Sequence, residues 1–185
     1  MDTRWSHQPE FSGLFPLLIS ALLVSGAHAT EPTGSLYNLP VTWTDDAGKS
    51  VSLAQWKGKL VIITMAYSAC PRMCAVTLKK LEEFQAALDR KNQAAEIVIV
   101  SYDPKNDTPQ KWSQYRKQRK LQRANWHFLT GGRPGTIALA GMLGLSNFWS
   151  EEGHIFHDFK ISVLNAAGVI EKQIGWKDLN TKNVF

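Results

Sequence analysis

The chain contains the stretch KLVIITMAYSACPRMCAVTLKKLEEF at residues 59–84, which joins an apolar run to a helical repeat. Residues 59–68 are continuously apolar and β-branched in their first half, which predicts a strand buried on both faces. From Cys74 onward, apolar residues recur at helical spacing with Lys and Glu between them, which predicts an amphipathic helix. Cys70 and Cys74, the only two cysteines, therefore lie where a buried strand turns into a helix.

The sequence after this stretch continues the alternation of strands and helices. Further strands are predicted at 95–103 and 126–130. A helix is predicted at 108–121, started by Thr108 with Pro109 at its first position. A last helix covers the segment RPGTIALAGMLGL, residues 133–145.

A β-hairpin is predicted at each end of this βαβαβα series. The first has its turn at Asp46–Gly48, and the second has its turn at Asn165–Gly168 and lies at the sheet edge. Alternating strands and helices predict an α/β fold with a mostly parallel central sheet that is covered by helices on both faces. We expect residues 30–185 to form one domain.

Composition and charge narrow the class of protein. The 185 residues are 44% hydrophobic and 20% charged, with a net charge of +5, and two cysteines are too few for a disulfide-rich scaffold. Much of the positive charge lies in residues 111–123, which form either a solvated helix face or a docking face for an acidic partner protein. We expect no nucleic-acid partner, because the chain has no binding motif for one and its N-terminus resembles an export signal.

The N-terminal segment has the pattern of a secretory signal peptide. An uncharged apolar run precedes the small-x-small triplet Ala27-His28-Ala29, which predicts cleavage before Thr30 and thus a signal at residues 1–29. The run is shorter than the ~20 residues of a membrane-spanning helix. We therefore expect an exported, periplasmic protein. If the segment is not cleaved, it would anchor the domain to the membrane facing the periplasm.

The two cysteines allow three interpretations: a structural disulfide, a redox-active pair, or a metal site. Their position at the carboxyl end of a strand is where open α/β sheets place their sites. Pro71 suits the start of the turn, and the helix N-terminus is expected to lower the pKa of the thiols. Four residues of helix bring the thiols to about 6 Å from each other, close enough for a disulfide or for a shared ion.

A histidine could complete a metal site. His7 and His28 lie in the predicted signal, and His127 lies within the strand WHFLT, where a core or edge role is expected. His154 and His157 precede the last predicted hairpin, His154 in a loop. Two thiolates and one imidazole suit a soft ion, copper first, whereas a structural zinc site would usually have a fourth protein ligand.

Three features of the chain resemble the Sco (SenC/PrrC) family of copper chaperones, and the resemblance covers nearly the whole mature chain. The segment from 45 to 84 is similar to the family's stretch around Cys-Pro-x-x-Cys-Pro, although Ala75 stands in place of the last Pro. The segment VSYDPKNDTPQKW resembles its Asp-Pro-x-x-Asp-Thr-Pro motif. The family places its ligand histidine eleven residues before the turn glycine of the last hairpin. Counting back from Gly168 gives His157.

The resemblance implies a thioredoxin-like fold and a copper site, for Cu(I) or Cu(II), formed by Cys70, Cys74 and His157. The same two cysteines would form a redox-active disulfide. Asp103 would lie near the site, outside the set of ligands.

The resemblance also implies a function and partners. The protein would deliver copper to cytochrome c oxidase subunit II, or keep the cysteines of that client reduced. An upstream donor would supply copper to the protein, or a thiol reductant would reduce its cysteines. Such a protein is a metallochaperone and not primarily an enzyme.

The alternative is a thiol–disulfide oxidoreductase or thiol peroxidase on the same fold. Thioredoxin-type oxidoreductases resemble one another in carrying a cis-Pro ahead of the last hairpin, and no Pro occurs between His157 and Gly168. Three residues separate the two cysteines, where a thioredoxin-type motif has two, and this spacing also weighs against general disulfide exchange. A copper-responsive signalling protein would carry the same site.

Overall fold

The structure is a computed structural model of the whole chain, and it describes residues 34–70, 73–145, 149–151 and 154–178. All of these belong to one unit, Glu31–Phe185. Several residues considered above lie outside the described part of the chain: those of the predicted signal, including His7 and His28, and also Pro71 and Arg72. Within the described part, no helix combines the length and the apolar character that crossing a membrane requires.

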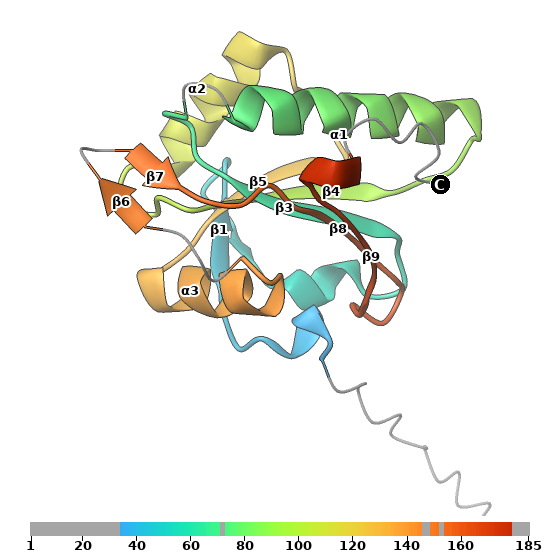
Figure 1. Cartoon of the computed structure of the whole chain (residues 1–185), viewed down its shortest axis with the longest axis horizontal. Coiled ribbons are helices and arrows are strands. Elements are labelled where there is room, and N and C mark those ends of the chain that lie inside the picture. The colour runs from blue at the N-terminus through green and yellow to red at the C-terminus, as the bar shows by residue number, and fades with distance from the viewer. Residues whose placement is uncertain (1–33, 71–72, 146–148, 152–153, 179–185) are drawn as a thin grey trace, which may run out of the picture. The chain divides into compact units, whose positions relative to one another are not determined.

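A seven-stranded mixed sheet forms the centre of the fold, in the order β2-β1-β5-β4-β3-β8-β9 (Figure 1). A separate two-stranded sheet contains β6 and β7. The strands are β1 Trp43–Asp45, β2 Ser50–Val51, β3 Val61–Ala66, β4 Glu96–Ser101, β5 Trp126–Thr130, β6 Trp149–Glu151, β7 His154–Phe156, β8 Ile161–Leu164 and β9 Ile170–Ile174.

Three α-helices cover both faces of the sheet. In Figure 1, α1 and α2 lie on one side of it and α3 lies on the other. The helices are α1 Met73–Arg90, α2 Pro109–Arg119 and α3 Arg133–Met142, with 3₁₀ turns η1 Leu36–Asn38, η2 Leu53–Trp56 and η3 Trp176–Asp178. The predicted layers, a central sheet flanked by helices and an N-terminal β-hairpin, are confirmed. The expectation of a mostly parallel sheet is wrong: among the described residues β3–β4 and β4–β5 pair in parallel and the other four pairings are antiparallel, because the two hairpins add antiparallel strands at both sides.

Strand direction decides which loops meet. β3, β4 and β5 are parallel, so the loops that follow them emerge at the same edge of the sheet. β8 runs antiparallel to β3, with Thr64 opposite Ile161 and Val61 opposite Leu164. The chain therefore enters β8 at the edge where it leaves β3, which places the segment before β8 beside the loop that carries Cys70.

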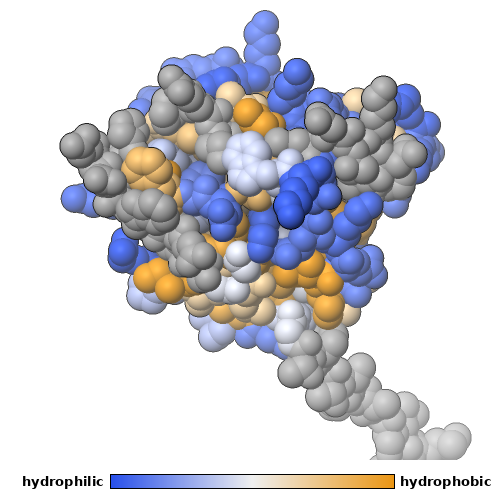
Figure 2. Space-filling view, viewed as in Figure 1, coloured by the Kyte–Doolittle hydropathy of each residue, from blue (hydrophilic) through white to orange (hydrophobic). Residues whose placement is uncertain are grey.

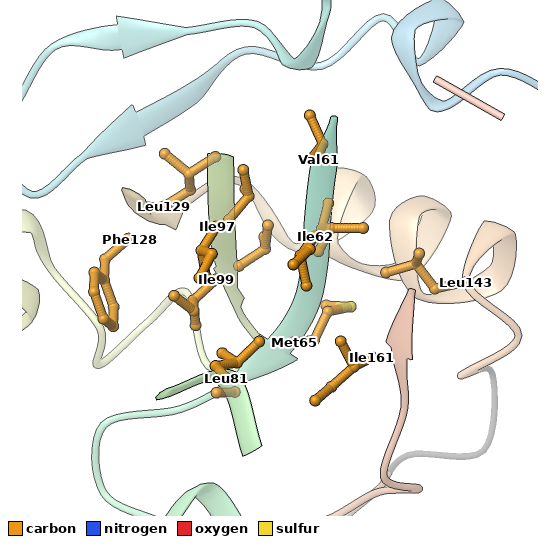
Figure 3. Packing of buried hydrophobic residues seen from close by; sticks show 14 of the residues in the cluster. Val61, Ile62, Met65, Leu81, Ile97, Ile99, Phe128, Leu129, Leu143 and Ile161 are labelled. Carbon is orange, nitrogen blue, oxygen red and sulfur yellow. The ribbon is translucent and has the colours of Figure 1, made fainter. Parts of the chain in front are cut away.

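The core lies on both sides of β3 and β4. Every residue of β3 is buried, as the apolar run predicts, and β4 is buried from Ile97 to Ser101. Figure 3 shows Ile62, Ile97 and Phe128 packed with side chains from the helices and from β8. Thr64 is the polar residue of β3, and its hydroxyl donates to the carbonyl of Lys160 at 2.6 Å.

The start of α2 follows its sequence signals. The Thr108 hydroxyl accepts the N–H of Lys111 at 3.2 Å, and Pro109 is the first helical residue. The prediction for this helix is therefore confirmed, apart from its end, which comes at Arg119 rather than at residue 121. Lys120 adopts a left-handed conformation (φ 57°) and ends the helix.

One prediction about local structure is wrong. The sequence predicts a loop around His154, whereas His154–Phe156 forms β7 and pairs with β6. Three-residue strands are too short for an alternating pattern to stand out, so sequence periodicity does not identify them.

The turn glycine of the last hairpin provides a stability test. Gly168 has φ +77°, and a Cβ there would lie 2.6 Å from ring atoms of Tyr37. We expect Gly168→Ala to lower the free energy of unfolding by about 3 kcal/mol, because left-handed strain and overpacking add together. Chemical denaturation would measure this change.

Gly48→Ala is the matched control, since Gly48 also lies in a hairpin turn with positive φ (+82°), but a Cβ there would have nothing within 4 Å. It should cost only about 1 kcal/mol, the strain alone. Equal losses in the two variants would contradict the packing argument.

Candidate metal centre

The carbonyl of Tyr67, just after β3, orients both cysteines. It accepts the backbone N–H of Cys70 at 3.2 Å and the thiol of Cys74 at 3.5 Å. The backbone N–H of Cys74, in the first turn of α1, donates to the Cys70 sulfur at 3.3 Å. The predicted strand-to-helix turn therefore brings both sulfurs together, buried and not bridged to each other.

The third residue, His157, reaches the cysteines from the segment between β7 and β8. Its Nδ1 lies 2.9 Å from the carbonyl of Asp158. A carbonyl can only accept, so Nδ1 carries the proton and Nε2 presents its lone pair. Its ring stacks on Tyr102, with 4.4 Å between centroids, and meets the edge of Tyr67.

The three side chains form one group of donors. The sulfurs of Cys70 and Cys74 and a ring nitrogen of His157 all lie within 4.8 Å of one another. Within the described residues, His157 Nε2 is buried and has no hydrogen-bond partner. A buried polar atom without a partner is unfavourable, and a metal ion would satisfy it. Two sulfurs and an imidazole suit a soft transition metal.

The acidity of Cys74 differs from the sequence-based expectation. Its position at a helix N-terminus predicts a lowered pKa for the thiol. Instead, the pKa of Cys74 is raised well above its ordinary range, first by its hydrogen bond with the Cys70 side chain and second by burial. The prediction is wrong for this residue because the Cys70 contact and desolvation together outweigh the helix dipole. An incoming ion must therefore displace the Cys74 proton.

Asp107 fixes the loop before the cysteines, although sequence reasoning did not single it out. Its buried carboxylate accepts the N–H and hydroxyl of Ser68, at 3.1 and 2.5 Å, and the hydroxyl of Ser101 at 2.5 Å. Burial raises the pKa of Asp107, and the hydrogen bonds from the two serines oppose this rise. The carboxylate thus ties the Cys70 loop to the end of β4. In the sequence, Asp107 could have been identified as the second Asp of the Asp-Pro-x-x-Asp-Thr-Pro motif.

Asp103 lies near the start of the β4–α2 loop, which also contains Asp107. Its carboxylate accepts the side-chain N–H of Asn106 at 2.7 Å, and its backbone N–H donates to Ser101. These contacts join Asp103 to the end of β4 and to its own loop, and a role for Asp103 near the metal stays a prediction.

The other two histidines considered above have different positions. His127, on β5, meets the Glu96 carboxylate at 2.8 Å and packs against Trp56. His154 is the first residue of β7, and the structure does not describe its side chain. Among the described residues, the group of potential metal ligands contains only Cys70, Cys74 and His157.

Comparison with known proteins gives a family match over more than half of the chain. A family model described as SCO1/SenC matches residues 29–141. The chain belongs to the SCO1/SenC family. A curated relative, the SCO1 protein homolog of Bacillus subtilis, is 30% identical over 92 residues, which are 50% of this chain and 48% of that protein. The match thus spans about half the length of this relative.

Solved structures support the fold. Arabidopsis thaliana ScoI with copper bound has a TM-score of 0.67 at 21% identity, covering 77% of this chain and 90% of that one. BsSco, described as a member of the Sco family of cytochrome c oxidase assembly proteins, has a TM-score of 0.66 at 24% identity, covering 79% and 86%. The thioredoxin-like fold that the resemblance implied is confirmed.

Replacing Asp107 tests its structural role. Asp107→Ala leaves the buried hydroxyl of Ser101 and two part-buried donors of Ser68 without their acceptor, so we expect the free energy of unfolding to fall by about 3 kcal/mol. The matched control is Asp103→Ala in the same loop, whose carboxylate makes one exposed hydrogen bond. It should cost less than about 1 kcal/mol. Denaturant titration of both variants measures the difference, and similar losses would contradict the assignment.

Proposed function

We propose that this protein binds copper, as Cu(I) or Cu(II), through Cys70, Cys74 and His157, and hands it to a client protein. The observation that carries the proposal is the buried group of two sulfurs and one unpartnered imidazole nitrogen among the described residues. The copper-bound structure of a relative with the same fold supports copper as the ion. The ion is cargo in this proposal.

The donor set favours copper over structural zinc. A closed zinc site takes four protein ligands, and the described residues offer a group of three. Two thiolates satisfy Cu(I), while the imidazole adds the nitrogen that Cu(II) prefers. The same residues can therefore hold either oxidation state.

The surface next to the ligands suits a transient partner. On the face shown in Figure 2, most of the coloured surface is polar, with separate apolar patches. Four large apolar side chains of the described residues are exposed, and two of them adjoin ligands: Val76 follows Cys74 by two residues, and Phe156 precedes His157. We propose as this client a copper protein such as cytochrome c oxidase subunit II.

The same thiols could reduce the client's cysteines before copper transfer. In that reaction Cys70 and Cys74 form a disulfide and pass two electrons and two protons to a client disulfide. The hydrogen bond from the Cys74 N–H to the Cys70 sulfur supports this second activity, because it keeps the two thiols close. General disulfide exchange is less favoured, since Cys74 is buried and protonated.

The copper proposal predicts one ion per reduced chain. Titration with Cu(II) should produce thiolate-to-copper charge-transfer bands, and prior oxidation of Cys70 and Cys74 to a disulfide should abolish binding. His157→Ala should weaken Cu(II) binding more than Cu(I) binding, because Cu(I) can be held by two thiolates.

His154→Ala is the matched control, a second histidine three residues earlier, and it should leave the spectrum nearly unchanged. If the oxidised protein takes up as much copper as the reduced protein, the cysteine site is refuted. Loss of the bands in His154→Ala but not in His157→Ala would refute the histidine assignment.

We also propose that the protein is exported to the periplasm, with the signal at residues 1–29 removed. The support is the triplet Ala27-His28-Ala29 behind a short apolar run. N-terminal sequencing of protein isolated from its native compartment should give a chain that starts at Thr30. A chain that starts at Met1 and stays with the membrane would instead identify an anchor.

A further inference from the structure

Tyr67 contacts all three proposed ligand residues. It is buried directly after β3, and its carbonyl accepts from Cys70 N–H and the Cys74 thiol. Its ring is nearly perpendicular to the His157 imidazole, in a T-shaped pair with centroids 6.1 Å apart. Tyr67 thus adjoins the sulfur and the nitrogen ligands at once.

The hydroxyl of Tyr67 makes a separate contact with the strand before His157. It donates to the carbonyl of Ile155 and accepts the N–H of Ile155, both at 3.3 Å. The N–H and C=O of one strand residue point to the same side, so the hydroxyl binds the edge of β7 that faces away from β6. The Tyr67 hydroxyl thus binds backbone groups of β7 that a neighbouring strand would otherwise bind.

This contact matters because β7 belongs to a small sheet of its own. In the described part of the chain, β6 and β7 pair with each other and form no ladder with the seven-stranded sheet. An isolated two-stranded hairpin is marginally stable, so its position depends on contacts with the rest of the protein. The Tyr67 hydroxyl and the partly buried Ile155 side chain provide such contacts.

We infer that Tyr67 is a positioning residue of the metal centre, whose hydroxyl holds β7 and so sets the reach of His157 toward the two sulfurs. The inference rests on the proposed copper site. The sulfurs depend on the Tyr67 backbone carbonyl, which a phenylalanine would keep. The hydroxyl also hydrogen-bonds with the Cys70 side chain, so the variant removes one contact of a sulfur ligand in addition to the hold on β7.

The experiment compares Tyr67→Phe with Tyr37→Phe in the full reduced chain. Tyr37 is the matched control, because it is also buried and its hydroxyl also donates to a backbone carbonyl, that of Trp56 at 3.2 Å. Each protein is titrated with Cu(II) alone, and with Cu(I) against a competing chelator. Amide hydrogen exchange of Ile155 is measured in the metal-free proteins.

We expect Tyr67→Phe to weaken Cu(II) binding about tenfold, a typical effect of losing a group that orients a ligand, and to weaken Cu(I) binding by a smaller factor, because both thiolates and the Tyr67 carbonyl remain. Exchange of the Ile155 amide should become about tenfold faster, because its acceptor is gone. Tyr37→Phe should change neither property. Wild-type Cu(II) affinity in Tyr67→Phe, an equal loss for both copper ions, or the same losses in Tyr37→Phe would overturn the inference.

Failure of the proposed function gives a different result. In that case the wild-type protein itself takes up no copper. The exchange measurement still applies, because it uses metal-free protein: faster Ile155 exchange in Tyr67→Phe supports the positioning role, and unchanged exchange overturns it.

Discussion

The antiparallel pairing of β8 with β3 is the constraint on which the metal centre depends. Cys74 and His157 are far apart in sequence and meet because the chain enters β8 at the edge where it leaves β3. The bond from the Thr64 hydroxyl to the Lys160 carbonyl fastens this entry point. A slip of one residue would move every side chain of β8 to the other face of the sheet, so the packing of its buried side chains against each face specifies the register. The core thereby determines where the imidazole lies.

Around this constraint, backbone groups orient most of the donors. The Tyr67 carbonyl receives Cys70 N–H and the Cys74 thiol, and the Asp158 carbonyl fixes the tautomer of His157. Backbone carbonyls cannot be changed by substitution, which makes the geometry tolerant of sequence change. The side-chain supports, Asp107 behind the Cys70 loop and Tyr67 beside β7, then adjust loops whose ends the sheet already places.

Much of this could be predicted from the sequence, and the reasons are local. The apolar run of β3, the Thr108-Pro109 start of α2 and the turn at Gly168 each carry their own physical signal. The short strands β6 and β7 do not, because three residues show no period. That the two sulfurs and His157 would meet was expected only through the family resemblance, since spacing says nothing about contacts between distant segments. The raised pKa of Cys74 depends on its hydrogen bond with the Cys70 side chain and on burial, which only the folded structure supplies.

The metal-free site is arranged at some energetic cost, and this cost favours metal binding. His157 Nε2 is buried without a hydrogen-bond partner among the described residues, a state that costs roughly 1–3 kcal/mol. Stacking on Tyr102 and the bond to Asp158 hold the ring there despite that cost. The Cys74 proton opposes this tendency, because burial and the Cys70 contact retain it. Binding of a soft ion would satisfy the nitrogen and release the proton, so its affinity should rise with pH. Because the ion binds only the folded arrangement, it also stabilises the fold. A site in which one ligand favours the ion and another resists it suits the proposed uptake and release of copper.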